Sequence, residues 1–279
     1  MIPVDNHARR LPRNYETMAL YAICTLIFAF LMFPILLTIP MSFSPAVSLQ
    51  FPPHGFSLRW YQKYFTNESW VNGTVTSIKV AITTMILATG LGILASFGLV
   101  RGKFPGKDIV YAIIISPMII PSIILAIALY RMFGKLHLVG NPLGLTLAHT
   151  VLAIPFVVVN VSATLKGFDE TLEQAAMSLG AARFKTIWYI TFPIIRPGLI
   201  TGALFAFITS FDEAIVAIFL SGLRAYTLPK RMWDSFTHEM DPVIAAASTL
   251  LILLSILLLS TVELLRRRSE RLKSVMSDE

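Results

Sequence analysis

Six long apolar segments dominate this chain of 279 residues and limit what it can fold into. A helix needs about 20 predominantly apolar residues to cross the hydrocarbon core of a bilayer. Charged residues make up only 14% of the chain, whereas a typical soluble protein has about 25%. We therefore predict an all-α integral membrane protein with six transmembrane helices, at Met18–Ile39, Val75–Val100, Ile109–Tyr130, Leu143–Leu165, Pro197–Leu220 and Val243–Leu265.

Basic residues are distributed unevenly between the connecting segments. Fifteen of the 23 Lys and Arg residues fall in the two terminal tails and in the connections after the second and fourth spans. Lys and Arg collect on the cytoplasmic side of membrane proteins, so these segments and both termini are predicted to be cytoplasmic. The net charge of +7 then reflects topology, and binding to nucleic acid is not expected. The predicted units are a cytoplasmic N-terminal tail (1–16), a six-span domain (17–268) with a cytoplasmic loop (166–196), and a cytoplasmic C-terminal tail (269–279).

One polar stretch, Leu172–Gly198, interrupts this apolar chain on the predicted cytoplasmic side. Asp169 suits the N-terminal cap of a short helix, and Gly180 suits its C-terminal end. A second helix is expected to follow and to end at Pro193 and Pro197, where the chain enters the fifth span. The pattern predicts a short helix–turn–helix, although an amphipathic helix lying at the membrane surface would account for part of it.

The spacing inside this stretch resembles the permease subunits of ATP-binding-cassette importers of the type I fold. Their cytoplasmic loop carries Glu-Ala-Ala, then Gly, then Ile-x-Leu-Pro. This chain has Gln174-Ala175-Ala176, Gly180 and Ile190-Thr191-Phe192-Pro193 at matching spacing, with Gln in place of Glu and Phe in place of Leu. The resemblance implies a coupling helix that docks on an ATPase, with Glu173, Gln174, Ala175, Ala176, Gly180 and Ala181 as the coupling residues.

The resemblance also implies how the work is divided between chains. ATP and Mg²⁺ would bind to a cytoplasmic ATPase dimer, and this chain would bind no cofactor and would not be an enzyme. In agreement, the segment RGKFPGKD has neither the spacing nor the Ser or Thr of a phosphate-binding Gly-x-x-x-x-Gly-Lys-Ser/Thr loop.

A second set of residues narrows the resemblance to one branch, the permeases for spermidine and putrescine. The set comprises Thr209–Val216, Phe219–Gly222 and Tyr226–Pro229. This implies a small cationic solute, a periplasmic binding protein that delivers it, and a bacterial inner-membrane location. It also favours a second permease subunit that is a different chain.

Asp212 and Glu213 are unusual because ionisable residues inside predicted spans are costly and are functional by default. Asp212 is the first candidate for the translocation path, with Glu213, Ser210 and Asn160 as further candidates. A structural role stays open, either as an ion pair with Lys79 or as a hydrogen-bonded helix break with Ser210.

Several further readings follow from the residues. Gly198 and Gly202 are predicted to allow close helix packing. The aromatic residues of the 42–70 loop are interpreted as a belt at the membrane interface, and contact with the binding protein is the alternative. The alternatives are the same kind of importer for iron, an opine, an aminophosphonate or another amino compound and, more remotely, a membrane enzyme or channel. The five histidines are dispersed and form no metal-binding motif, which argues against a metalloenzyme.

Overall fold

The computed structural model describes residues 15–47, 51–239 and 241–277, and these ranges contain helices and no strands. Most of the predicted N-terminal tail lies outside the described residues. The α-helices are α1 (Tyr15–Ser42), α2 (Arg59–Thr66), α3 (Glu68–Arg101), α4 (Lys107–Ile115), α5 (Ser122–Lys135), α6 (Pro142–Lys166), α7 (Thr171–Ser178), α8 (Arg183–Thr186), α9 (Phe192–Phe211), α10 (Ile215–Leu220), α11 (Leu228–Asp234) and α12 (Val243–Ser277). Short 3-10 turns occupy Ser116–Met118 and Leu223–Ala225, and π turns occupy Ile187–Thr191 and Ser235–Glu239.

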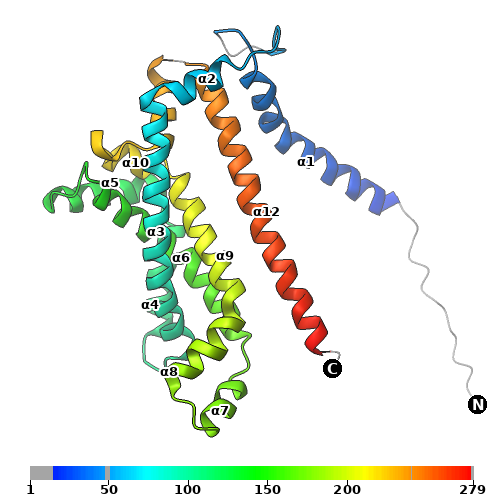
Figure 1. The fold of residues 1–279 in the computed structure, drawn as a ribbon, viewed down its shortest axis with the longest axis vertical. Helices are drawn as coiled ribbons and strands as arrows, with labels where there is room; N and C mark the ends of the chain where they lie inside the picture. Colours follow the sequence, from blue (N-terminus) through cyan, green and yellow to red (C-terminus); the bar gives the residue numbers. More distant parts are fainter. Residues whose placement is uncertain (1–14, 48–50, 240, 278–279) are drawn as a thin grey trace, which may run out of the picture.

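Three long helices, α3, α6 and α9, run side by side through the centre of the molecule (Figure 1). The first turns of helix α12 pack against the bundle near α2 and α9, the rest of α12 diverges from it, and α1 leans away and contacts α12. The short helices α7 and α8 lie at one end of the bundle, and α2 lies at the opposite end. Large apolar side chains of α1 from Met18 to Phe33 are exposed, which suits a helix whose surroundings are apolar rather than aqueous.

Glycines allow the three central helices to approach closely around Val157 of α6. A Cβ atom added to Gly92 of α3 would lie 2.5 Å from Val157 Cγ1. A Cβ added to Gly202 of α9 would lie 3.1 Å from Val157 Cα, and one added to Gly198 would overlap Thr164 of α6. The close packing predicted for Gly198 and Gly202 is therefore confirmed, and Gly92 contributes to it from a third helix.

Five helices of the described chain are long and apolar enough to cross a membrane, and a bent helix pair brings the possible count to six. This agrees with six predicted spans. The third span predicted at Ile109–Tyr130, where two prolines are expected to kink the helix, is this bent pair: Lys107–Met118 and Ser122–Lys135 meet at an angle of 102°. Pro117 and Pro121 lie at the bend, where each removes a backbone donor and favours a break.

The prediction that Pro193 and Pro197 end the second helix of the cytoplasmic loop is wrong. One continuous helix runs from Arg183 to Phe211 and contains both prolines. The π turn Ile187–Thr191 immediately precedes Pro193. Its wider turn re-pairs backbone groups that a proline would otherwise leave without a partner, so the helix continues. Residues 183–196 therefore belong to the spanning helix rather than to a separate loop.

The C-terminal end of the fifth predicted span is also different. Helix α9 ends at Phe211, and Ile215–Leu220 forms the separate helix α10. Asp212 and Glu213 thus lie in a break between two helices and not inside one continuous span. This places them where backbone groups are free to bond with side chains.

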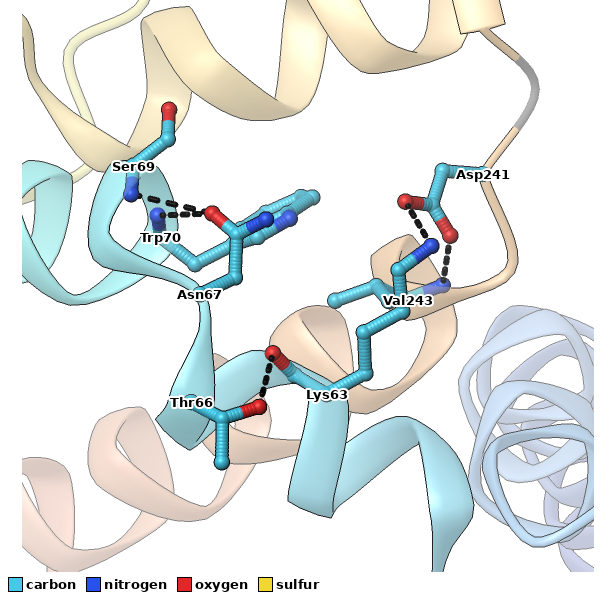
Figure 2. Close-up of polar contacts among 7 residues, drawn as sticks. All are labelled: Lys63, Thr66, Asn67, Ser69, Trp70, Asp241 and Val243. Carbon is cyan, nitrogen blue, oxygen red and sulfur yellow. Dashed lines mark hydrogen bonds and ion pairs between the residues drawn. The ribbon is translucent and has the colours of Figure 1, made fainter.

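The interpretation of the 42–70 aromatic residues as an interfacial belt is wrong for three of them. Trp60, Tyr64 and Trp70 are 5%, 3% and 0% exposed, and they pack with α11 and α12. Figure 2 shows the polar contacts around this cluster: Asn67 caps the start of α3, and the Lys63 ammonium lies 2.9 Å from Asp241, just before α12. The segment is therefore a packed cover on this end of the bundle.

Candidate functional site

Helix α7 lies at the end of the bundle where α3 and α6 finish (Figure 1). Asp169 Oδ1 accepts a hydrogen bond from the Thr171 amide at 2.9 Å, so this carboxylate satisfies a free donor at the start of the helix. That hydrogen bond holds the pKa of Asp169 below its ordinary value.

The end of α7 is a glycine-dependent turn. Gly180 has φ +90°, and its amide donates to the Met177 carbonyl at 2.9 Å. The Ala181 amide donates to the Ala176 carbonyl at 3.0 Å. This pair of bonds defines a Schellman motif, which requires a left-handed residue at the position of Gly180. The predicted helix with a glycine stop is therefore confirmed in its geometry.

Most residues predicted for coupling are accessible on this turn. Gln174, Ala175 and Gly180 are exposed, and Ala176 and Ala181 are half-buried. Leu179, at the tip of the turn, is 90% exposed.

Glu173 differs from its neighbours because it points back into the bundle and is 9% exposed. One carboxylate oxygen accepts from the Arg101 guanidinium at the end of α3, and the other accepts from the Thr191 hydroxyl. Burial raises the pKa of Glu173, but the bonds from Arg101 and Thr191 and the charges of Arg101 and Arg183 outweigh it, so the pKa lies below its ordinary value. The group is ionised at neutral pH.

A half-open cavity of about 540 Å³ separates α7 from the end of α3. Its lining is rich in charged side chains of both signs, which belong to the end of α3, the segment after it, α7 and α8. The charged residues are Arg101, Lys103, Lys107, Glu170, Glu173 and Arg183.

The carboxylates predicted for the translocation path lie far along the chain from this turn, in the break after α9. Asp212 is exposed, and the Glu213 carboxylate accepts from the Val216 amide at 3.0 Å at the start of α10. Lys79 is exposed on α3, and among the described residues it forms no ion pair with either carboxylate. Of the structural alternatives, the Lys79 pair is therefore not present. The break after α9 does contain a side-chain hydrogen bond, but the Glu213 carboxylate forms it with the start of α10 and not with Ser210.

Ser210 and Asn160 are placed differently from Asp212. Ser210 Oγ lies 2.9 Å from Nδ1 of His149, and both side chains are buried between α9 and α6. The Asn160 amide donates to the Phe156 carbonyl within α6 at 2.8 Å and is half-buried. The structure thus brings Ser210 together with His149 and does not bring Ser210 or Asn160 into contact with Asp212. Their participation in a path stays a prediction.

Sequence reasoning missed Arg101 and Thr191 as members of the α7 site. Arg101 was read only as one of the basic residues after the second span, and Thr191 only as the variable position in Ile-x-Phe-Pro. The signal for Arg101 was its position as the last residue of a long apolar run. Nothing in the local sequence indicated Thr191.

Comparisons with known proteins identify the family of this chain. The family model described as binding-protein-dependent transport system inner membrane component matches residues 88–271. The chain belongs to this family. The permease is 34% identical over 230 residues to the putrescine transport system permease protein PotI of Escherichia coli (strain K12), which covers 80% of this chain and 82% of that protein. It is 31% identical over 247 residues to the spermidine/putrescine transport system permease protein PotC of Haemophilus influenzae, covering 87% and 94%.

Solved structures place the permease in the same fold. A chain of a bacterial ABC transporter for import of the acidic polysaccharide alginate superposes with a TM-score of 0.71 at 16% identity, over 90% of this chain and 98% of that chain. A chain of the MetNI methionine ABC transporter in an inward-facing conformation gives 0.54 at 19% identity, over 72% and 93%. The family match and the polyamine permease relatives make this chain a multi-pass inner-membrane permease subunit of an ABC importer.

Proposed function

We propose that this permease forms one half of the membrane pathway of a polyamine importer and that α7, with the turn at Gly180, is its docking point for a cytoplasmic ATPase. The observation that carries the docking role is the Schellman turn that presents Leu179 almost fully exposed. Folding gains nothing from leaving that side chain in water, whereas a partner surface would cover it. The predicted coupling residues Gln174 and Ala175 lie on the accessible side of the same helix.

The cargo follows from the relatives and from one exposed carboxylate. PotI and PotC are named for putrescine and for spermidine with putrescine. A polyamine carries several ammonium groups, and a carboxylate in an apolar bundle would stabilise such a cation as it passes. Asp212 is exposed in the break after α9 and is the group we assign to this contact, whereas Glu213 is already engaged with α10.

The proposed machine has four kinds of component. A periplasmic binding protein delivers the solute, a second permease completes the pathway, and an ATPase dimer binds ATP and Mg²⁺ on chains separate from this one. In support, one alginate transporter neighbour is described in complex with a periplasmic protein. With both termini and α7 in the cytoplasm, closure of the ATPase dimer would move α7, open the pathway outward and admit the solute, and hydrolysis would reset it. Alternating access of this kind needs no cofactor on the permease itself.

The cargo assignment is tested by uptake of radiolabelled putrescine and spermidine in cells that carry the complete system. Native cells should accumulate at least one polyamine, Asp212→Asn should lose most of this uptake, and Asp212→Glu should retain it because the charge is kept. The assembled complex should be isolable in each case. Absence of polyamine uptake by the native system would overturn the cargo, and full uptake by Asp212→Asn would make Asp212 a structural residue.

The docking assignment is tested at Gly180, where an added Cβ meets nothing within 4 Å and the only obstacle is the φ of +90°. Leu and Asn have similar shapes, but Asn tolerates the left-handed region and Leu does not. Gly180→Leu should therefore abolish capture of the ATPase and ATP-driven uptake, whereas Gly180→Asn should retain both. Normal coupled uptake in Gly180→Leu, with normal membrane insertion, would refute the docking role.

A further inference from the structure

Glu173 is the buried carboxylate on an otherwise exposed helix, and its partners come from two different long helices. Its oxygens accept from Arg101, which is 72 positions earlier in the chain, and from Thr191, which is 18 positions later. Thr191 closes the π turn that leads into α9 and is fully buried. A carboxylate is buried only where charge and hydrogen bonds compensate for lost water, and both are present here.

Arg101 is fixed on its other sides as well. Its guanidinium carbon lies 5.5 Å from the ring centroid of Phe97 and 5.4 Å from that of Phe168, the latter in the segment after α6. Its side chain is 17% exposed. Aromatic faces at this distance attract a guanidinium and limit its movement. Arg101 is therefore largely buried at the end of α3, and among the described residues its guanidinium hydrogen bond goes to Glu173 while Nε and Nη2 have no hydrogen-bond partner.

Because a cavity lies between α7 and the end of α3, the ion pair is a direct contact between these two helices. Close packing cannot transmit a displacement across an open space, and α7 otherwise packs on α8 and on the π turn. The Glu173–Arg101 bridge crosses this space and joins α7 to α3 directly. The Thr191 hydroxyl joins the same carboxylate to the helix that becomes α9.

We propose that Glu173 and Arg101 are the positioning pair that passes displacement of α7 to the spanning helices α3 and α9. This inference rests on the proposed function, because it presupposes that an ATPase moves α7. In this inference Glu173 acts through the bundle, because its carboxylate faces Arg101 and Thr191 rather than the exposed side of α7. Loss of the pair should leave docking and ATP hydrolysis in place but disconnect them from solute movement.

The test uses the complete complex in lipid nanodiscs and proteoliposomes and compares solute taken up per ATP hydrolysed. Glu173→Gln keeps the shape of the side chain and removes its charge, and we expect the ratio to fall by about 5-fold or more. Glu170→Gln is the matched control, since Glu170 is exposed and lines the same cavity on the approach to α7. The control should keep the native ratio.

Two further measurements separate a positioning role from a simple folding defect. Removing one partner leaves a buried charge alone, so Glu173→Gln could fail to assemble, whereas Arg101→Leu with Glu173→Leu removes both charges and should assemble. We expect this double variant to bind and stimulate the ATPase and yet remain uncoupled. Spin labels attached at the positions of Ser178 and Lys103 report the separation of α7 from the segment after α3. The distribution of this distance should broaden in the double variant and not in the Glu170→Gln control.

The outcomes distinguish this inference from the proposed function. If the native complex shows no ATP-driven uptake or no ATPase capture, the proposed function fails. If the native complex is coupled and the assembled double variant keeps the native ratio, the positioning role is refuted while the docking role stands.

Discussion

Gly92 provides the sharpest test of how tightly the three central helices pack. An added Cβ would lie 2.5 Å from Cγ1 and 2.7 Å from Cβ of Val157, which is fully buried and branched at Cβ. Neither atom is the free end of a flexible side chain, so the two helices must move apart. Inserting one methyl group into such a packed site costs about 1–3 kcal/mol.

The same helix contains its own control. Gly90 lies two residues earlier in α3, is exposed, and would place a new Cβ within 4 Å of nothing in the described chain. Gly to Ala in a helix interior gains about 1 kcal/mol from backbone propensity at both sites. Because that gain cancels, the difference in unfolding free energy between Gly90→Ala and Gly92→Ala isolates the overpacking cost of about 1–3 kcal/mol.

The assay is reversible unfolding of the purified permease in mixed micelles by SDS titration, followed by tryptophan fluorescence. Gly90→Ala should unfold at or above the native midpoint, and Gly92→Ala should unfold below it. Adding Val157→Ala to Gly92→Ala should cost less than the sum of the two single changes, because the two side chains compete for the same space. Equal stability of Gly90→Ala and Gly92→Ala would refute the close approach of α3 and α6.

Two further predictions concern the opposite end of the bundle. Asn67→Ala should lower the unfolding free energy by about 1 kcal/mol, because the Asn67 side chain accepts hydrogen bonds from the Ser69 amide at 2.9 Å and the Trp70 amide at 3.4 Å. Asn67→Asp keeps an acceptor oxygen at this position and should be nearly neutral. Equal loss of stability in both variants, measured in the same SDS titration, would contradict the cap. Burial, then the hydrogen bond to Asp234 and its charge, raise the pKa of Tyr226 to about 12. A raised pKa means that this contact contributes stability fully below about pH 10 and loses it as the pH rises toward 12. The ionised tyrosine absorbs at 295 nm, so the difference in this absorbance between the native protein and Tyr226→Phe should develop only near pH 12. A midpoint near pH 10 would show that Tyr226 is neither buried nor bonded to Asp234.

Local patterns were sufficient for the membrane class, the approximate spans and the turn at Gly180. Each depends on residues close together in the chain: an apolar run long enough for a bilayer, or a glycine placed after a short helix. The predicted end of the helix at Pro193 was wrong, because the π turn before this proline lets the helix continue.

The candidate site residues also differ in whether nearby or distant residues determine their surroundings. The resemblance to importer permeases indicated Glu173, Gln174 and Gly180 together, and the exposure of Gln174 and Gly180 follows from a turn that is built locally. The burial of Glu173 could not be predicted, since it depends on Arg101 and Thr191 approaching from other helices. Likewise, no local pattern indicated that Ser210 would bond with His149 between α9 and α6.

Apolar length, the placement of basic residues and the glycine turn after α7 could all be inferred from the amino-acid order. Which carboxylate faces outward and which is buried in the bundle became visible only in the folded chain. Hydrophobic length and turn preference are encoded by adjacent residues. The burial of a charge, in contrast, is acceptable only when distant parts of the chain bring its partners into contact.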